Sequence, residues 1–402
     1  MTVIPMLTCR PYVSDDLVAV RSLLTDADAV VQGDWLHLHH RDLTGVITAD
    51  AAGATSTILW QDETLLVAGR PVQANQVRMV AQRGDQTSAE GLRQALHHLA
   101  GQPGPVCHLL VGRVTRPGWD NAGFVPLRCG LSLHLPAARG LPGPTDTTLR
   151  PATASDMTAI IGLAARRNAT LTGPTVRSAA AWRTWFPVLR QPVSVLLAQG
   201  PEGPSGYLRL RLDAGEPQTA VVEEWVDLDA AALHAFFGYL HYLRGLGYAV
   251  DASSLPVDRG LLTVSGPIAG VRAWDERGVA VRPGLPAFFL PALRYGAGPG
   301  RLCLGVTDSL GQWPARLELA WRDGALTAWQ PTGAEPDVSL SLSTLAALAF
   351  GDVQPAAAAE LGWLLPAEAE HLQHLDVWAP QPFYRYPGDE RPGITGERGR
   401  LG

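Results

Sequence analysis

The sequence repeats a short pattern, which reads CRPYVSDDL at residues 9–17 and LRPATASDM at residues 149–157. Each copy places Arg-Pro after a short strand pattern and a Ser/Asp pair before residues with helical apolar spacing. A side-chain oxygen at such a position caps a helix by accepting an N–H of its first turn, and we expect this of Ser14 or Asp15 and of Ser155. The repeat predicts two copies of one fold. The alternative is a chance match, because strand–cap–helix starts are common in α/β proteins.

The composition is typical of a globular protein with several domains. The chain has 402 residues, of which 46% are hydrophobic and 17% charged, and its formal net charge is −6. Since a domain takes roughly 100–200 residues, two or three domains are expected. All 32 basic residues are arginines, which excludes a Walker A lysine, a Schiff-base lysine and a Ser–Lys nucleophile pair. The mild acidity gives no reason to expect a nucleic-acid partner.

The cysteines and the N-terminus favour a cytoplasmic protein. The four cysteines lie far apart, as expected of reduced buried side chains and not of disulfides or a zinc site. Residues 1–7 lack the pattern of a signal peptide, and no run of about 18 apolar residues predicts a membrane span. His37 and His39 share one face of an expected strand, yet no third ligand follows at a convincing spacing, so we expect no metal.

Strand and helix patterns alternate along the chain and are interrupted by two Pro/Gly-rich linkers, at residues 137–145 and 296–300. We expect separate strands at 55–60 and 64–68, a helix at 89–100 and another at 230–246. The last third adds four strands and helices at 343–350 and 366–375. Residues 386–402 are polar and rich in Pro and Gly, which predicts a mobile tail.

Residues 119–124, which read WDNAGF before a further strand, resemble the Gly-Phe turn of the GNAT acetyltransferase superfamily, and the order of the upstream elements agrees. Two such units followed by PDVSLSL at 336–342 and an apolar helix resemble the enhanced-intracellular-survival type of aminoglycoside acetyltransferase. The resemblance implies an α+β protein with GNAT-like mixed-sheet domains at 1–140 and 146–295. It also implies a sterol-carrier-like α+β domain at 301–385 and a flexible tail at 386–402.

The family transfers an acetyl group from acetyl-coenzyme A to an amine and binds the cofactor pyrophosphate on backbone N–H groups where a helix begins. The nearest match to its loop is QTSAEG at 86–91, in which Ala89 replaces the first glycine. The resemblance places the cofactor against Val80, Ala81, Arg83, Gln86, Thr87, Ser88, Ala89, Glu90 and Gly91. N–H groups of the strand 77–81 would polarise the thioester carbonyl. Asp85 and Glu90 bring two carboxylates to this loop, and the alternative is a helix that merely has acidic residues in its first turn.

The catalytic residues look degenerate. Trp119 occupies the position of the family's general-acid tyrosine, and an indole N–H does not give up a proton near neutral pH. A slow or inactive enzyme is therefore expected, with packing on the sheet as the other interpretation of Trp119. Longer family members use the terminal carboxylate as the general base; here Gly402 follows a polar, Arg-containing run, which leaves that role open.

The acceptor is expected to be a small-molecule amine. Candidate lining residues are Asp26, Asp28 and Trp35, with Glu223 and Glu224 in the second unit; for the two glutamates a solvated strand edge is the alternative. The acidic segment 227–229 has no glycine, which predicts that the second unit has lost the phosphate loop.

Two other functions stay open: a non-catalytic relative that binds a small or apolar ligand, and a scaffold. The family is oligomeric, and the apolar helix at 345–350 also favours a homo-oligomer.

Overall fold

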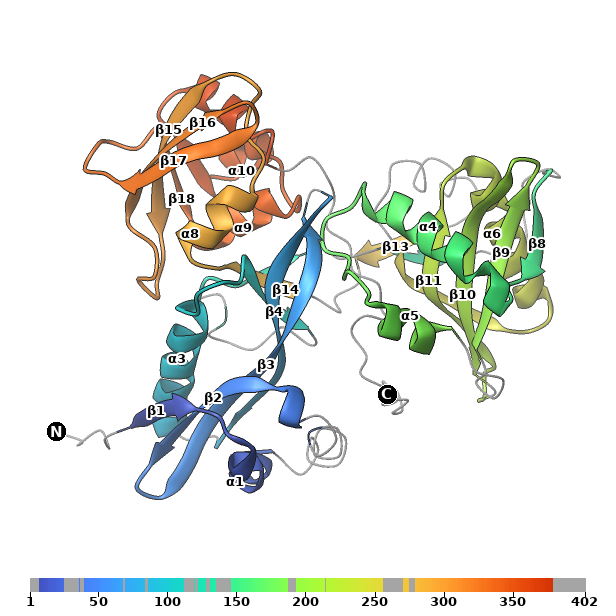
Figure 1. The fold of residues 1–402 in the computed structure, drawn as a ribbon, viewed down its shortest axis with the longest axis horizontal. Coiled ribbons are helices and arrows are strands. Elements are labelled where there is room, and N and C mark those ends of the chain that lie inside the picture. Colours follow the sequence, from blue (N-terminus) through green and yellow to red (C-terminus); the bar gives the residue numbers. More distant parts are fainter. Residues whose placement is uncertain are drawn as a thin grey trace.

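The computed structural model describes residues 7–24, 36, 40–67, 69–83, 86–111, 119, 122–127, 131–134, 146–186, 193–213, 215–255, 270–274 and 279–378. These residues form three β-sheets with helices packed on them (Figure 1). None of the helices in this part of the chain is long and apolar enough to cross a membrane.

The first sheet has seven strands, and a helix lies on each of its faces. In sheet order the strands are β1 (Thr8–Pro11), β2 (Thr44–Asp50), β3 (Gly53–Val67), β4 (Arg70–Gln82), β5 (Cys107–Val111), β14 (Val279–Pro283) and β6 (Val125–Leu127). The helices are α1 (Leu17–Ser22) and α3 (Gln86–Ala100), with short turns η1 (Ser14–Asp16) and η2 (His40–Asp42). The strands expected at 55–60 and 64–68 are one continuous strand, β3, because the polar residues 61–63 continue its pairing with β4 and do not form a turn.

The second sheet repeats this plan. In matching order its strands are β8 (Thr148–Pro151), β9 (Val193–Gly200), β10 (Gly203–Asp213), β11 (Thr219–Asp227), β12 (Ala249–Leu255), β7 (Leu131–His134) and β13 (Gly270–Trp274). Its helices are α4 (Met157–Asn168), α5 (Ala179–Trp185) and α6 (Ala230–Gly245), with the turn η4 (Ala154–Asp156). In both sheets the fourth and fifth strands are parallel neighbours.

The two sheets exchange one strand each. β7, from the first half of the chain, lies between β12 and β13 of the second sheet, and β14 from the second half lies between β5 and β6 of the first. Each exchanged strand fills the sixth position of its host sheet. Neither sheet is complete without the other half of the chain, so the two units form a single interlocked body.

The repeat in the sequence is also a repeat of side-chain contacts. Arg10 holds Asp16 through two hydrogen bonds of 2.7 and 2.6 Å, and Arg150 holds Asp156 through bonds of 2.8 and 2.7 Å. The same aspartates accept a backbone N–H from three residues upstream, at Val13 and Thr153. The expected capping by Ser14, Asp15 or Ser155 is therefore wrong; the aspartate one or two residues later closes the turn because the arginine fixes its carboxylate there.

The third sheet belongs to the C-terminal part. Its strands, in order, are β17 (Ala325–Pro331), β16 (Arg316–Arg322), β15 (Gly300–Thr307), β18 (Val338–Ser341) and β19 (Leu364–Pro366). The helices and turns are α8 (Pro286–Phe289), η5 (Leu290–Ala292), α9 (Leu342–Ala349), α10 (Pro355–Glu360) and η6 (Ala369–His374). The helix expected at 366–375 is only the short turn η6. Helix α9 is buried within the chain, so it offers no free surface for a subunit contact, and the homo-oligomer stays a prediction without that support.

A long arm formed by the ends of β3 and β4 joins the three parts, and Figure 1 shows it rising between the other two sheets. Residues 173–176 hydrogen-bond to the backbone of Thr64 and Leu66 on this arm. On its other side Leu65, Val67 and Ala74 belong to one apolar core with the third sheet. The arm therefore fixes the second and third parts of the chain to the first.

Candidate functional site

The first sheet opens between two parallel strands. β4 pairs with β5 only from Ala74 to Val77, although both strands continue. At this point β4 has a bulge, because Val77 and Met79 face consecutive residues of β3 and leave Arg78 as the extra residue. A bulge twists and bends its strand. Beyond Val77 the described backbone of β4 makes no ladder bond to β5, so an extended group could pair with it there.

Helix α3 begins beside this opening and packs unusually close to the sheet. A Cβ at Gly91 would lie 2.6, 2.8 and 2.9 Å from the hydroxyl oxygens of Thr48, Thr55 and Ser56. These buried hydroxyls hydrogen-bond to one another, at 2.9 Å between Thr48 and Thr55 and 2.6 Å between Thr48 and Ser56. Gly91 therefore brings the first turns of α3 onto the sheet. The first N–H groups of a helix have no intrahelical partner and can bind an anion.

The residues expected to contact a cofactor lie around this opening. Val80 and Ala81 are on β4 beyond the bulge, and Gln86, Thr87, Ser88 and Ala89 form the first turn of α3. Arg83 donates to Asp50 at 2.6 Å. Asp85 lies outside the described residues.

The acidic charge of the first turn of α3 is compensated. Glu90 accepts two hydrogen bonds from Arg93, at 2.8 and 2.7 Å. The Arg93 hydrogen bonds hold the pKa of the Glu90 carboxyl below its ordinary value. The carboxylate expected to repel a phosphate therefore carries its own counter-charge on the next turn.

The Gly-Phe turn belongs to the apolar core beneath α3. Trp119 is 5% exposed and contacts Phe124 edge-on, with ring centroids 5.3 Å apart. Gly123 has φ +77°, and a Cβ there would lie 2.3 Å from the Arg282 guanidinium. Arg282 comes from the exchanged strand β14 and donates to the carbonyl of Ala122 at 2.8 Å. The turn thus needs glycine both for its backbone and for this arginine.

Arg282 also connects the turn to the third sheet. Its guanidinium pairs with Asp308 at 3.1 and 3.0 Å, and both side chains are buried. Burial lowers the pKa of Arg282, and Asp308 opposes that shift. No pattern in the sequence predicts this pair, because its members lie on two different parts of the chain and meet only through strand exchange.

Only some of the residues expected to line the acceptor site lie in the described part of the chain. Asp26, Asp28 and Trp35 lie outside the described residues, as do His37 and His39. Glu223 is half-buried and pairs with Arg209 and Arg211. Glu224 is buried, and β11 is an interior strand between β10 and β12. The solvated-edge interpretation of these glutamates is therefore wrong.

Glu224 is enclosed by partners on the α4 side of the second sheet. Its carboxylate accepts from Arg177 at 2.9 and 2.8 Å, from the Trp185 indole at 2.6 Å and from the Tyr207 hydroxyl at 2.5 Å. The Arg177 guanidinium in turn lies over the Trp182 ring, 4.8 Å from its centroid. A carboxylate paired in this way presents no free charge to a cationic acceptor.

The second sheet has the same opening, since β11 pairs with β12 only from Thr219 to Val221, but the helix that follows begins differently. β11 carries the same bulge, at Glu223, so Glu224 corresponds to Met79. Helix α6 follows β11 after a shorter connection, and the carboxylate of Asp229 accepts the N–H of Ala232 at 2.7 Å. That carboxylate occupies an N–H that an anion would need. The predicted loss of the phosphate loop therefore has a structural counterpart in this aspartate cap.

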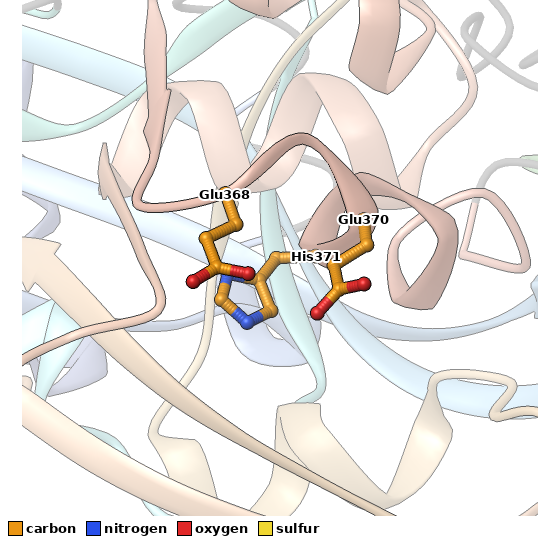
Figure 2. Close-up of side chains that lie close together, drawn as sticks. All are labelled: Glu368, Glu370 and His371. Atoms are coloured by element: carbon orange, nitrogen blue, oxygen red, sulfur yellow. The ribbon is translucent and has the colours of Figure 1, made fainter.

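One group of possible metal ligands occurs in the described residues. Glu368, Glu370 and His371 bring their ligand atoms within 4.8 Å of one another (Figure 2). Both glutamates are exposed, and His371 lies 3.9 Å from Asp337. Exposed acidic groups are common on surfaces without a bound ion, and this group lies on the third sheet's side of the chain, away from the opening.

Family models match two parts of the chain. Residues 173–272 match an acetyltransferase (GNAT) domain, and residues 286–383 match a sterol carrier protein domain. The chain combines a GNAT acetyltransferase fold with a sterol-carrier domain. This is the architecture of the enhanced-intracellular-survival type, and the mixed α+β fold agrees with it. The sequence-level GNAT match falls on the second unit, whereas the opening described above lies in the first.

Solved structures show the same fold over nearly the whole chain. A GCN5-related N-acetyltransferase from Anabaena variabilis ATCC 29413 matches with a TM-score of 0.74 and 16% identity, covering 95% of this chain and 99% of that one. One from Kribbella flavida has a TM-score of 0.67 and 18% identity, covering 96% and 99%. Eis1 from Mycobacterium abscessus has a TM-score of 0.59 and 17% identity, covering 85% and 89%. No curated protein matches the chain.

Proposed function

We propose that the first GNAT unit transfers an acetyl group from acetyl-coenzyme A to an amine of a small molecule. The observation that carries the proposal is the start of α3. Both units open between the fourth and fifth strands, but in the second unit the Asp229 carboxylate already occupies an N–H at the start of the helix. The GNAT fold supports acyl transfer in general. Acetyl-coenzyme A and the amine are the finer part of the proposal.

The chain's own residues suit the binding of such a cofactor. N–H groups at the start of α3 would hold the pyrophosphate, with Arg83 and Arg93 adding positive charge beside Asp50 and Glu90. The unpaired edge of β4 beyond Val77 would hold the amide-bearing arm as an added strand. N–H groups near Val80 and Ala81 would stabilise the negative charge that develops on the thioester oxygen.

The reaction proceeds by direct attack. The neutral amine nitrogen forms a bond to the thioester carbon, the carbon–sulfur bond breaks, the nitrogen loses one proton to water, and the thiolate takes one proton. Trp119 cannot supply that proton, so water does. A positioned acid is typically worth a factor of about 10²–10⁴, and we expect slow turnover.

The test is acetyl transfer from acetyl-coenzyme A to a panel of polyamines and aminoglycosides, in the wild type and in Trp119→Tyr. A phenol with an ordinary pKa of about 10 can protonate the thiolate, so the rate per enzyme should rise in the variant. Because Trp119 is buried against Phe124, the melting temperature of the variant is measured alongside.

The competing function is a non-catalytic relative, which the tryptophan at the acid position favours. Binding of acetyl-coenzyme A without transfer in either form would support that function. If acetyl-coenzyme A did not bind at millimolar concentration, the first unit would have no cofactor site.

A further inference from the structure

Gln76 is a buried amide without a hydrogen-bond partner. The residue is 0% exposed, and within the described part of the chain neither its Oε1 nor its Nε2 atom has a partner. Buried polar groups in folded proteins are almost always paired, and an unpaired one costs stability. Such a group needs a structural or functional explanation.

Gln76 lies where the opening begins, at the end of the paired part of β4 and β5. Gln76 lies opposite Leu109, one residue before the last β4–β5 pair, Val77 and Leu110. Val77 and Leu110 belong to the core beneath α3, whereas Leu109 belongs to the core on the other face. Since side chains alternate along a strand, Gln76 faces away from α3.

The second unit has an apolar residue at the same place. There the last parallel pair is Val221 with Asp251, and the bulge that follows aligns Val221 with Gln76. Val221 is buried. Both units open between the fourth and fifth strands, but at this position the first unit has a partnerless amide and the second has an apolar side chain.

We propose that Gln76 binds the acceptor amine. The inference rests on the proposed function. In that function the cofactor phosphates lie at the start of α3, and the amide-bearing chain of the cofactor enters between β4 and β5. The thioester then emerges on the opposite face of the sheet, where Gln76 lies. Oε1 of Gln76 accepts one N–H of a neutral primary or secondary amine. This contact directs the nitrogen lone pair toward the thioester carbon, and Gln76 itself exchanges no proton.

The test is Gln76→Met, which keeps the length of the side chain and removes its polar atoms. We expect the melting temperature without ligands to rise, because a partnerless amide is gone. Loss of one hydrogen bond to substrate should lower kcat/KM for the amine by about 3- to 10-fold. The Kd for acetyl-coenzyme A should stay at the wild-type value. Gln76→Val, which copies the second unit, should give the same kinetic pattern if the first variant folds poorly.

His108 provides the matched control. It is also fully buried with both ring nitrogens partnerless in the described residues, but it shares the α3 face with Leu110. His108→Met should raise the melting temperature and leave the kinetics unchanged.

The role of Gln76 would be overturned by a wild-type kcat/KM for the amine in Gln76→Met, or in Gln76→Val if the first variant folds poorly. Failure of the proposed function is recognised separately, because the wild type itself would then transfer no acetyl group, and the role of Gln76 would fall with it.

Discussion

The two GNAT-like units have the same strand order, the same bulge in the fourth strand and the same Arg–Asp pair at their start, yet they differ where the helix after the fourth strand begins. In the first unit Gly91 on the helix packs against hydroxyls of β2 and β3. In the second, Ala232 is on the helix and Gly206 is on the strand beneath it. In both units a glycine, either on the helix or on the strand beneath it, allows the helix to pack closely on the sheet. Under the proposed function, cofactor binding would depend on the few residues where the helix after the fourth strand begins.

The largest expected effect concerns the closed unit. Glu224→Met copies Met79 of the first unit but leaves Arg177 buried without its carboxylate, which should cost about 3–5 kcal/mol. The double variant Arg177→Met with Glu224→Met should recover most of that loss, since apolar side chains often replace a buried ion pair without cost. Urea unfolding measures both. If the unfolding free energy of Glu224→Met were within about 1 kcal/mol of the wild-type value, the buried Arg177 would not need Glu224 as its counter-charge.

A pair of glycine variants separates packing from binding. Gly91→Ala and Gly206→Ala each place a Cβ within 2.6 Å of a neighbouring atom, and overpacking of this kind costs about 1–3 kcal/mol. Gly91→Ala should also weaken binding of acetyl-coenzyme A, because it moves the first turns of α3 away from the opening. Calorimetric titration checks this, and equal affinities in the two variants would contradict the assignment of the site to the first unit.

The smallest effect depends on pH. Burial, aided by Arg282, lowers the pKa of His108 to about 3, whereas the unfolded chain protonates it near 6.5. The unfolded state therefore binds the extra proton as pH falls from about 6.5 toward 3, and the protein loses up to about 1.4 kcal/mol for each pH unit in that window. The second unit has Val250 at this position.

His108→Met should remove this part of the acid sensitivity, as measured by unfolding free energies of both proteins at pH 7 and pH 5. Parallel losses in the two proteins would show that His108 is protonated in the folded state at pH 5.

The sequence was sufficient for the fold class and for most of the second unit. Helix α6 was expected at 230–246 and occupies Ala230–Gly245, because an aspartate cap and a continuous apolar pattern mark it. The strand exchange was not predictable, since the short strands β7 and β14 carry no local signal of which sheet they join. The sequence pattern did not predict β2. The polar residues 61–63 predicted a break between two strands, whereas β3 continues through them because they belong to a two-stranded arm.

The candidate site was predicted less completely than the fold. The resemblance led to the α3 loop and to Trp119, whose roles stay predictions; the structure shows that Trp119 packs in the core beneath α3. The solvated-edge interpretation of Glu224 was wrong. The bulge at Glu223 breaks the regular alternation of side chains along β11, so the face on which Glu224 lies could not be predicted. Gln76 gave no signal, since a single amide in a strand looks the same in sequence whether it faces solvent or a buried opening. Arg282 and Asp308 meet only in three dimensions.

The central claim is that one unit of the two binds the cofactor, and the stoichiometry of binding tests it most directly. Acetyl-coenzyme A is titrated into the purified full-length chain, and the heat of binding gives the number of sites per chain. The account predicts one site. Two sites would show that the aspartate cap of α6 does not close the second unit, and no binding would show that the opening beside α3 is not a cofactor site.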